Sequence, residues 1–522
     1  MKALTIREAS NWATEVFEKI VTESNISYLV QYGRIEKIID NGETKVLLPE
    51  LEKYYREKNI AQKTSWLASN GDSVNWDLSF QKYSEAQTTK HVHRLHPYKG
   101  KFIPQLVEYF LDEHTDTYKK EVYFRKGDIV LDPFCGSGTT LVQANELGIN
   151  AIGVDVSQFN AMISNCKIDK HDLAGLQGRI NKINELLIED PKVIAFDSEL
   201  KDALASYNQK YFPSARFAKA VIEKRVDEKK YGKEKEEIFL ETYKNIAKKH
   251  GFDYALSENG SFVEKWFFKS IRSEIEIIKN FIQNEQNEQI KKALTIVLTR
   301  TMRSCRATTH ADLATLLKPI TTSYYCSKHK KICKPLYSLK KWWTEYSIDT
   351  VTRLKSFDCQ RTETLQKCFI GNSKTIDLEA EMRDAGGDLF DLYKRQKIKG
   401  IFTSPPYVGM IDYHEQHAYA YDVFNLARQD EAEIGPLRKG NGRAARDSYA
   451  EGIAAVLNNC KKYLADDFEI FLVANDKFNL YPIIAEKANL TIVEKHHRPV
   501  LNRTEKDKSA YSETIFRLKE KK

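Results

Sequence analysis

Residues 127–157 read GDIVLDPFCGSGTTLVQANELGINAIGVDVS, and this stretch decides the fold. The apolar run at 129–131 predicts a buried strand, and Gly136 and Gly138 predict a tight turn that leads into a helix near Thr139. A second apolar run follows this helix and ends at Asp155. A strand, a glycine-rich turn, a helix and a second strand form a βαβ unit, so the sequence predicts an α/β fold with a doubly wound parallel sheet.

Further strand patterns appear only late in the chain. Residues 171–360 lack them and consist mainly of Lys- and Glu-rich runs with helical spacing, and residues 1–90 also look mostly helical. We therefore predict one α/β domain built from residues 91–170 and 361–522, interrupted by a mainly helical basic insert at 171–360 and preceded by a helical N-terminal extension at 1–90. The late strands are expected in KCFIGNS, KGIFTSPPY, FEIFLVAND and ETIFRLK, at 367–373, 399–407, 468–476 and 513–519.

The composition excludes several classes of protein. With 42% apolar and 30% charged residues, the chain has the balance of a globular protein, not of a disordered or collagen-like one. It contains no run of about 18 apolar residues, so we expect no membrane-spanning helix. Arg7 and Glu8 interrupt the N-terminus, so we expect no signal peptide. The eight scattered cysteines are then expected to be reduced thiols in a cytoplasm.

Positive charge is concentrated in one part of the chain. Residues 291–340 contain eleven Lys and Arg against one acid, Asp312, whereas the whole chain has a net charge of +8. A concentrated positive field attracts a polyanion, although a solvated basic face has the same composition and is an equally good interpretation of charge alone. The candidate nucleic-acid contacts are Arg303, Arg306, Lys328, Lys330, Lys331 and Lys334.

The glycine-rich turn at 132–139 has the chemistry of a nucleoside site. Its glycines let the backbone approach a ligand, and the free N–H groups of the following helix end face the same point. A carboxylate at Asp155 can accept hydrogen bonds from both hydroxyls of a ribose. The P-loop pattern is missing, and so is the third glycine of the dinucleotide fingerprint.

The tetrapeptide Ser404-Pro405-Pro406-Tyr407 directly follows the apolar run at 399–403. Two prolines cannot continue a central strand, so the chain must leave the sheet there. Open α/β sheets bind ligands at this end of their strands. The tetrapeptide is therefore either a rigid exit loop or part of a site.

Both motifs resemble those of DNA amino-methyltransferases, which methylate cytosine N4 or adenine N6. Asp132-Pro133-Phe134-Cys135-Gly136-Ser137-Gly138-Thr139 resembles the family's S-adenosylmethionine motif, and Ser404-Pro405-Pro406-Tyr407 resembles its catalytic motif. The resemblance implies a Rossmann-like methyltransferase sheet, with cofactor contacts from the first motif and from Asp155. It also implies cofactor contacts from His96, Tyr98, Lys99 and Phe102, and from Asn372, which stands where the family often has an acid.

The serine form of the catalytic motif is associated in this family more with cytosine N4 than with adenine N6. The resemblance therefore implies a bacterial or archaeal enzyme that methylates a flipped cytosine in double-stranded DNA, with the insert as its target-recognition domain. A cognate restriction endonuclease is expected to be a separate protein. The alternatives are adenine-N6 methylation, methylation of an RNA amine, and an inactive nucleic-acid-binding module. Residues 412–416 resemble a helix behind the cofactor, in which we expect His414 and Glu415 to be structural.

We expect no metal. Cys326, His329 and Cys333 have a spacing that zinc could use, with Cys305 as a distant fourth ligand. A pair of Cys-x-x-Cys motifs is missing, so reduced cysteines beside a loop histidine are the favoured interpretation.

Overall fold

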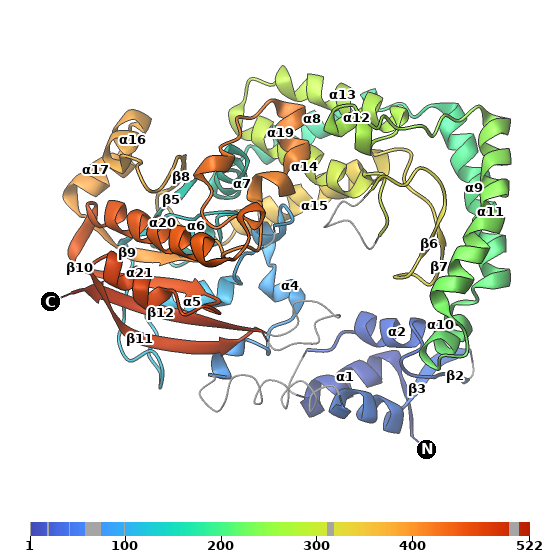
Figure 1. Ribbon diagram of the computed structural model, residues 1–522, viewed down its shortest axis with the longest axis horizontal. Coiled ribbons are helices and arrows are strands. Elements are labelled where there is room, and N and C mark those ends of the chain that lie inside the picture. The colour runs from blue at the N-terminus through green and yellow to red at the C-terminus, as the bar shows by residue number, and fades with distance from the viewer. Residues whose placement is uncertain are drawn as a thin grey trace.

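A computed structural model of the protein describes residues 2–17, 20–40, 42–57, 75–98, 100–310, 318–500 and 511–521. At its centre lies a seven-stranded sheet with the order β11–β12–β10–β9–β4–β5–β8 (Figure 1). The strands from β10 to β8 are parallel, and β12 is antiparallel to both of its neighbours. The α/β class is confirmed, with a mixed sheet. Its strands are β4 (Ile129–Asp132), β5 (Asn150–Asp155), β8 (Gln366–Ile370), β9 (Ile398–Thr403), β10 (Leu464–Ala474), β11 (Leu490–Pro499) and β12 (Ser512–Glu520).

Alternate residues of the central strands point into two separate cores. Ile129 and Leu131 belong to one core, and Val130 belongs to the other. Both faces of these strands are apolar because helices cover both. One face is covered by α16 (Leu378–Ala385), α17 (Asp388–Arg395), α20 (Arg443–Lys461) and α21 (Tyr481–Lys487). The other is covered by α5 (Pro104–Leu111), α6 (Thr139–Glu146) and α7 (Gln158–Ile168).

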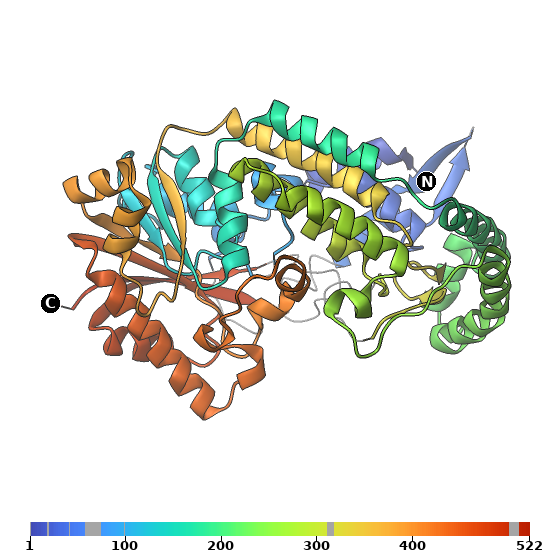
Figure 2. The same cartoon turned by 90° about the horizontal axis from the view of Figure 1, so that it is seen from above.

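The described residues of the insert, 171–310 and 318–360, are helical except for one short hairpin and the connections. Their helices continue the core of the second sheet face, among them α8 (Leu173–Leu186), α13 (Lys269–Gln283), α14 (Glu288–Cys305) and α15 (Lys340–Asp358). Two long helices, α9 (Pro191–Tyr211) and α11 (Glu228–His250), pack on each other and extend away from the sheet (Figure 2). The other elements are α10 (Ser214–Ile222), α12 (Phe262–Trp266), and the antiparallel hairpin of β6 (Tyr324–Cys326) and β7 (Lys331–Cys333).

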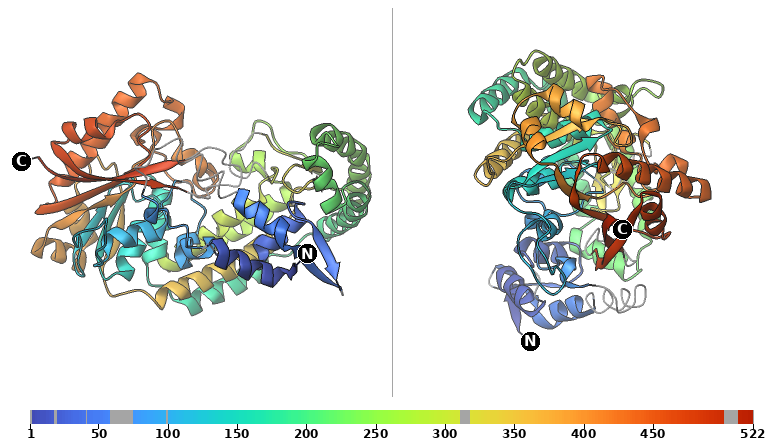
Figure 3. Two further views of the ribbon diagram at one scale, coloured as in Figure 1. Left: turned by 90° about the horizontal axis from the view of Figure 1, so that it is seen from below. Right: turned by 90° about the vertical axis from the view of Figure 1, so that its left-hand side faces the viewer.

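The N-terminal part differs from the expected helical extension. It contains α1 (Ile6–Phe17) and α2 (Glu23–Gln31), but also a three-stranded antiparallel sheet of β1 (Ala3–Thr5), β2 (Lys37–Asp40) and β3 (Glu43–Leu47). These strands are too short to show a clear period-two pattern. The unit has its own small core and meets α10 through an ion pair between Glu36 and Lys219 (Figure 3).

Short elements fill the space between the sheet and the insert. Before the sheet lie η2 (Asp77–Ser79), α4 (Glu85–Thr88) and η3 (His91–Arg94). After β9 lie α18 (Tyr413–Gln416), α19 (Ala418–Phe424), η4 (Asp430–Ala432) and η5 (Leu437–Lys439). Within the described ranges, no helix has the length and apolarity needed to cross a membrane.

Candidate active site

The two motifs meet at the carboxyl ends of neighbouring strands. Asp132 ends β4, Ser404 follows β9, and the two strands are parallel partners. The hydroxyl of Thr403 donates to Asp132 Oδ1 at 2.5 Å, which joins the two motifs directly. From β4 the chain passes to β5 on one side, whereas β9 lies on the other. This is the switch point at which open α/β sheets bind ligands.

A cavity of about 800 Å³, its open mouth included, lies at this point. Most of the predicted cofactor residues line it: Tyr98, Phe102, Asp132, Pro133, Phe134, Cys135, Gly136, Ser137, Thr139, Asp155 and Asn372, together with Ser404 and Pro406 of the Ser-Pro-Pro-Tyr motif. Among the described residues, His96, Gly138, Pro405 and Tyr407 lie outside its lining, and Lys99 is outside the described residues.

The glycine-rich turn is held in a conformation that needs its glycines. Gly136 has φ +52°, and a Cβ there would lie 2.9 Å from the hydroxyl oxygen of Tyr98. Gly138 has φ +75° and precedes the first residue of α6. Two side chains of α7 hold the carbonyl groups of the turn. The Ser164 hydroxyl donates to the Gly136 carbonyl at 3.0 Å, and the buried Lys167 side chain donates to the Ser137 carbonyl. The turn is therefore fixed before any ligand binds.

Asp155 lies at the end of β5 and faces the cavity. Its carboxylate accepts hydrogen bonds from the backbone N–H of Gly136 at 2.7 Å, from that of Ser157 at 2.8 Å and from Asn160 Nδ2 at 3.1 Å. Burial raises its pKa to about 6, and burial also raises the pKa of Asp132 to about 6. Both acids are thus charged at neutral pH. A carboxylate has about four acceptor positions, so Asp155 retains one for a ligand.

Asn372 follows β8 on the far side of β5. Its backbone is anchored because the N–H of Gly371 donates to the Asp155 carbonyl at 3.0 Å. The Asn372 Oδ1 atom accepts a hydrogen bond from the Lys374 N–H at 3.1 Å. The neighbouring Ser373 hydroxyl donates to the Pro133 carbonyl at 2.6 Å. These bonds bring the loop after β8 against the glycine-rich turn.

Three polar atoms in the cavity wall are buried and lack a hydrogen-bond partner among the described residues. They are Ser137 Oγ, Thr139 Oγ1 and Asn160 Oδ1. Leaving a buried polar group unpaired costs about 1–3 kcal/mol, so native proteins rarely tolerate it. All three belong to the elements around Asp155. Their placement fits a polar ligand at this end of the cavity.

The prolines of the Ser-Pro-Pro-Tyr motif turn the chain out of the sheet after Thr403, and Tyr407 is then fixed by β12. The Tyr407 hydroxyl donates to Glu513 Oε1 at 2.9 Å, and Arg498 donates to Glu513 Oε2 at 2.8 Å. Burial and the charge of Glu513 raise the pKa of Tyr407, so it stays a neutral phenol. The sequence did not indicate this partner, because Glu513 is more than a hundred residues away from the motif.

The segment before α5 closes over the glycine-rich turn. Tyr98 stacks on Tyr413 and His417, with ring centroids 6.2 and 6.0 Å apart. His96 is placed behind this layer, edge-on to Phe159 and with its Nδ1 3.0 Å from the Pro97 carbonyl. His96 therefore supports Tyr98 from outside the cavity.

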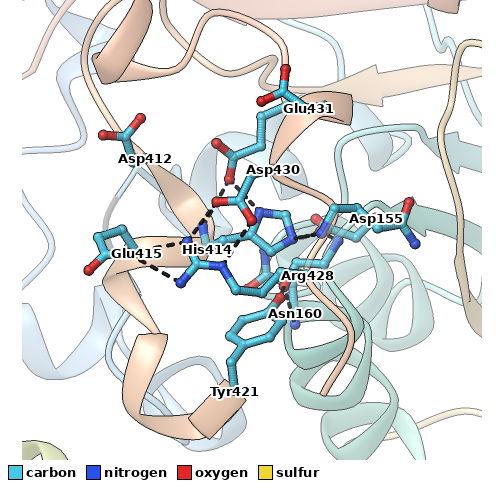
Figure 4. A network of polar contacts seen from close by, with 12 residues as sticks. Asp155, Asn160, Asp412, His414, Glu415, Tyr421, Arg428, Asp430 and Glu431 are labelled. Carbon is cyan, nitrogen blue, oxygen red and sulfur yellow. Dashed lines mark hydrogen bonds and ion pairs between the residues drawn. The ribbon is translucent and has the colours of Figure 1, made fainter. Parts of the chain in front are cut away.

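A polar network behind the cavity fixes the loop after α19 (Figure 4). His414 is buried, and its Nδ1 and backbone N–H lie 2.5 and 2.9 Å from Glu433 Oε1. Arg428 bridges Glu415 and Asp430 with hydrogen bonds of 2.6–3.3 Å. His414 and Glu415 thus hold other residues in place. Glu433 itself lines the cavity and was not predicted from the sequence. Lys101 and Tyr413 also line it; Tyr413 belongs to the segment 412–416 that was expected behind the cofactor, but neither was predicted as a cofactor contact.

The basic candidates of the insert fall into two groups. Lys330 pairs with Glu228, and Lys334 pairs with Asp197. Arg306 is buried, with its guanidinium 5.5 Å from the ring centre of Tyr419. Lys328 and Lys331 are exposed, and Arg303 is half-buried. Part of the local positive charge is therefore neutralised within the fold.

The last turn of α14 lies against α19, which follows the Ser-Pro-Pro-Tyr motif in the chain. Burial, with the positive charges of Arg303 and Arg306, lowers the pKa of His417 to about 3. His417 lies beside Tyr98 in the layer over the glycine-rich turn. The insert thus packs against α19, through α14 and the contact of Arg306 with Tyr419, behind the layer that holds Tyr98.

Comparison with known proteins decides the family. The model of a family described as DNA methylase (N6/N4) matches residues 28–165, which include the glycine-rich turn and Asp155. Type II methyltransferase M.MjaII of Methanocaldococcus jannaschii is 44% identical over 530 residues, covering 99% of this chain and 97% of that protein. The chain belongs to the N6/N4 DNA methylase family.

Two further relatives match the methylase over short segments. Type II methyltransferase M.BsoBI of Geobacillus stearothermophilus is 39% identical over 72 residues, or 14% of this chain and 13% of that protein. Type II methyltransferase M.MvaI of Kocuria varians is 33% identical over 94 residues, or 18% of this chain and 19% of that protein. Enzymes of this family use S-adenosylmethionine. The Asp155 carboxylate and the three unpaired polar atoms fit such a nucleoside ligand.

Proposed function

We propose that the methylase transfers a methyl group from S-adenosylmethionine to the exocyclic N4 amine of a flipped cytosine in double-stranded DNA. The observation that carries this proposal is the position of Ser404 in the cavity wall, directly after the strand residue that hydrogen-bonds Asp132. Ser404 begins a Ser-Pro-Pro-Tyr motif, the form that resembles cytosine-N4 enzymes more than adenine-N6 enzymes. Adenine N6 is the rival target, because both reactions use the same scaffold.

The cofactor half of the cavity consists of residues from β4, β5 and the loop after β8. We assign Asp155 to accept a hydrogen bond from a ribose hydroxyl, Asn372 to hydrogen-bond the adenine, and Ser137 and Thr139 to bind remaining polar atoms of the cofactor. When bound, S-adenosylmethionine supplies an electrophilic methyl group on a sulfonium. The preformed turn around Gly136 binds it without further ordering of the backbone.

The catalytic half must make a poor nucleophile reactive. The lone pair of an aromatic amine is conjugated with its ring, so an acceptor has to draw the amine hydrogens out of the ring plane. Ser404 Oγ and the Pro405 carbonyl are assigned to accept the two N–H groups, which aligns the lone pair with the methyl. Tyr407, fixed through Glu513, is assigned to stack on the base. The base must leave the duplex first, because its amine is otherwise paired.

Two properties of the chain and its relatives support DNA as the substrate in a restriction-modification setting. The relative that covers the whole chain is named a type II methyltransferase. The insert also presents exposed lysines at Lys328 and Lys331. We therefore assign the insert to target recognition and expect a separate cognate endonuclease.

The roles assigned to Ser404 and Tyr407 predict a separation of chemistry from cofactor binding. Ser404→Ala should lower the single-turnover rate of methyl transfer by about 10²-fold or more, the usual scale for losing a positioned proton acceptor. Cofactor affinity, measured by calorimetry, should stay near the wild-type value. Tyr407→Phe keeps the ring and should retain more activity than Tyr407→Ala.

The matched control is Ser273→Ala, which removes an exposed hydroxyl bonded only to the Lys269 carbonyl within α13. Its rate should equal that of the wild type. Methyl transfer by Ser404→Ala at the wild-type rate would show that the catalytic assignment is wrong. An equal loss of rate and of cofactor affinity would place Ser404 in cofactor binding instead.

A further inference from the structure

A second cluster of reactive side chains lies in the insert and has no role in methyl transfer. His310, Cys326, His329 and Cys333 each direct one possible ligand atom to a common point, and these atoms all lie within 4.8 Å of one another. None of the four lines the cofactor cavity. The set consists of two thiols and two imidazoles, which is the donor set of a Cys₂His₂ site.

The hairpin brings three of these residues together by its register. Cys326 at the end of β6 pairs with Lys331 of β7, and Cys333 is two residues further along β7. Residues two apart on a strand share a face, so both thiols lie on one face of the hairpin. The turn between the strands is closed by a 2.7 Å hydrogen bond from the Lys330 N–H to the Cys326 carbonyl. His329 lies in this turn and completes a Cys-x-x-His sequence.

Two of the separations are close to those of ligands around one ion, and one of them is the 3.9 Å between Cys326 Sγ and His310 Nδ1. Cys333 Sγ lies 3.5 Å from His329 Nδ1. Zn–S bonds of about 2.3 Å and Zn–N bonds of about 2.0–2.1 Å in a tetrahedron put sulfur and nitrogen roughly 3.5 Å apart. The rings of His310 and His329 have centroids 4.4 Å apart. The Tyr324 hydroxyl lies 2.7 Å from His310 Nδ1 and holds the imidazole of this fourth residue in place.

The four residues belong to two different parts of the insert, and this indicates what an ion bound by them would do. His310 follows the last turn of α14, whereas the other three residues belong to the hairpin. One ion bound by all four would tie the hairpin, with its exposed Lys328 and Lys331, to the helix end that carries Arg303 and Arg306. Cys305, the fourth ligand considered from sequence spacing, is buried at the end of α14 and does not belong to the cluster.

We propose that His310, Cys326, His329 and Cys333 bind one zinc ion in a closed, structural site that holds the basic hairpin in place. Four protein ligands leave no open position for substrate, so the ion is structural. Two thiolates and two neutral imidazoles balance the charge of Zn²⁺, and tetrahedral coordination by two sulfurs and two nitrogens favours zinc over hard cations. This proposal replaces the sequence-based expectation of no metal and does not depend on the proposed base specificity.

The test is the metal content of the full-length protein, purified without chelators from zinc-supplemented cells and measured by elemental mass spectrometry. We expect about one zinc per chain in the wild type, and close to none in Cys326→Ser and Cys333→Ser. The matched control is Cys359→Ser, which removes an exposed cysteine after α15 and should retain the zinc. A wild-type protein without zinc, or zinc retained in both hairpin variants, would overturn the proposal.

A second measurement uses only the wild-type protein, so it remains valid even if the variants fail to fold. Mercurial modification of the wild-type thiols should release zinc in a single step, which a chromogenic chelator detects. Release of less than a tenth of an equivalent would contradict the site. Calorimetry with S-adenosylmethionine on Cys326→Ser separates this proposal from the proposed function, because the cofactor cavity lies outside the cluster. Zinc loss with cofactor binding retained is the expected result.

Discussion

Asp155 and Asp132 are buried acids that are held mainly by neutral hydrogen-bond donors. Asp155 accepts from Gly136, Ser157 and Asn160, and Asp132 accepts from Thr403. Burial opposes their charged forms and raises the pKa of each to about 6. The carboxylate that we propose to bind the ribose therefore has a pKa that ordinary titrations can reach.

We expect cofactor affinity to fall as the pH drops through about 6, because protonation of Asp155 removes an acceptor from the ribose site. Asp155→Asn should weaken cofactor binding by about 1.5–3 kcal/mol at pH 7.5. It should also flatten the pH dependence of cofactor affinity, except for the part of that dependence that arises from Asp132. Calorimetry between pH 5 and pH 8 measures both effects. A wild-type affinity that is constant over this range would contradict the assignment.

The stability of the fold should respond in the opposite direction. An acid whose folded pKa is raised contributes stability that is fully present below its unfolded pKa of about 3.9 and is lost as the pH rises through about 6. Asp155 and Asp132 therefore do not drive unfolding near pH 5. A loss of cofactor there, with the melting temperature unchanged or higher, is attributable to the site.

Among the elements, those with strong apolar patterns were predictable and those set by distant partners were not. The strands β4, β5, β8, β9, β10 and β12 lie where their apolar runs indicate. Apolar patterning did not reveal β11, because it is an edge strand in which half-buried Glu494 and exposed Lys495 interrupt the apolar residues. It also missed Glu513 and Glu433 at the site, because only the tertiary fold brings them to Tyr407 and His414.

The β6–β7 hairpin makes a specific prediction about DNA binding, if its exposed lysines contact phosphates. Replacing Lys328 and Lys331 by Ala should flatten the dependence of log K on log salt by roughly 0.9 for each lost contact. The matched control is the double variant of Lys330 and Lys334, which are paired with Glu228 and Asp197. That control should leave the slope unchanged and lower the melting temperature.

Binding to duplex DNA at two or more salt concentrations gives these slopes. S-adenosylmethionine affinity should be unchanged in both double variants. Equal slopes for the wild type and the Lys328/Lys331 variant, with the fold intact, would show that the hairpin is a solvated basic face that does not contact DNA phosphates. A larger effect from the paired lysines than from the exposed ones would show that the ion pairs open on DNA.

At the scale of the whole molecule, the insert is continuous with the catalytic part. Its helices α8, α13, α14 and α15 share one apolar core with the sheet face that α5, α6 and α7 cover. The N-terminal unit has a separate core and meets α10 through the pair of Glu36 and Lys219 (Figure 3). The break in strand pattern at 171–360 is thus visible in the sequence, whereas the shared core is not, because it depends on which helix faces meet.

The identity of the methylated base decides between the two reactions that this scaffold supports. Duplex DNA of mixed sequence, incubated with the full-length methylase and labelled S-adenosylmethionine, is digested to nucleosides and analysed by mass spectrometry, with the Ser404→Ala variant in parallel. We expect label in N4-methyldeoxycytidine for the wild type and strongly reduced label for the variant. Label in N6-methyldeoxyadenosine, or label in RNA but not in DNA, would contradict the proposed function.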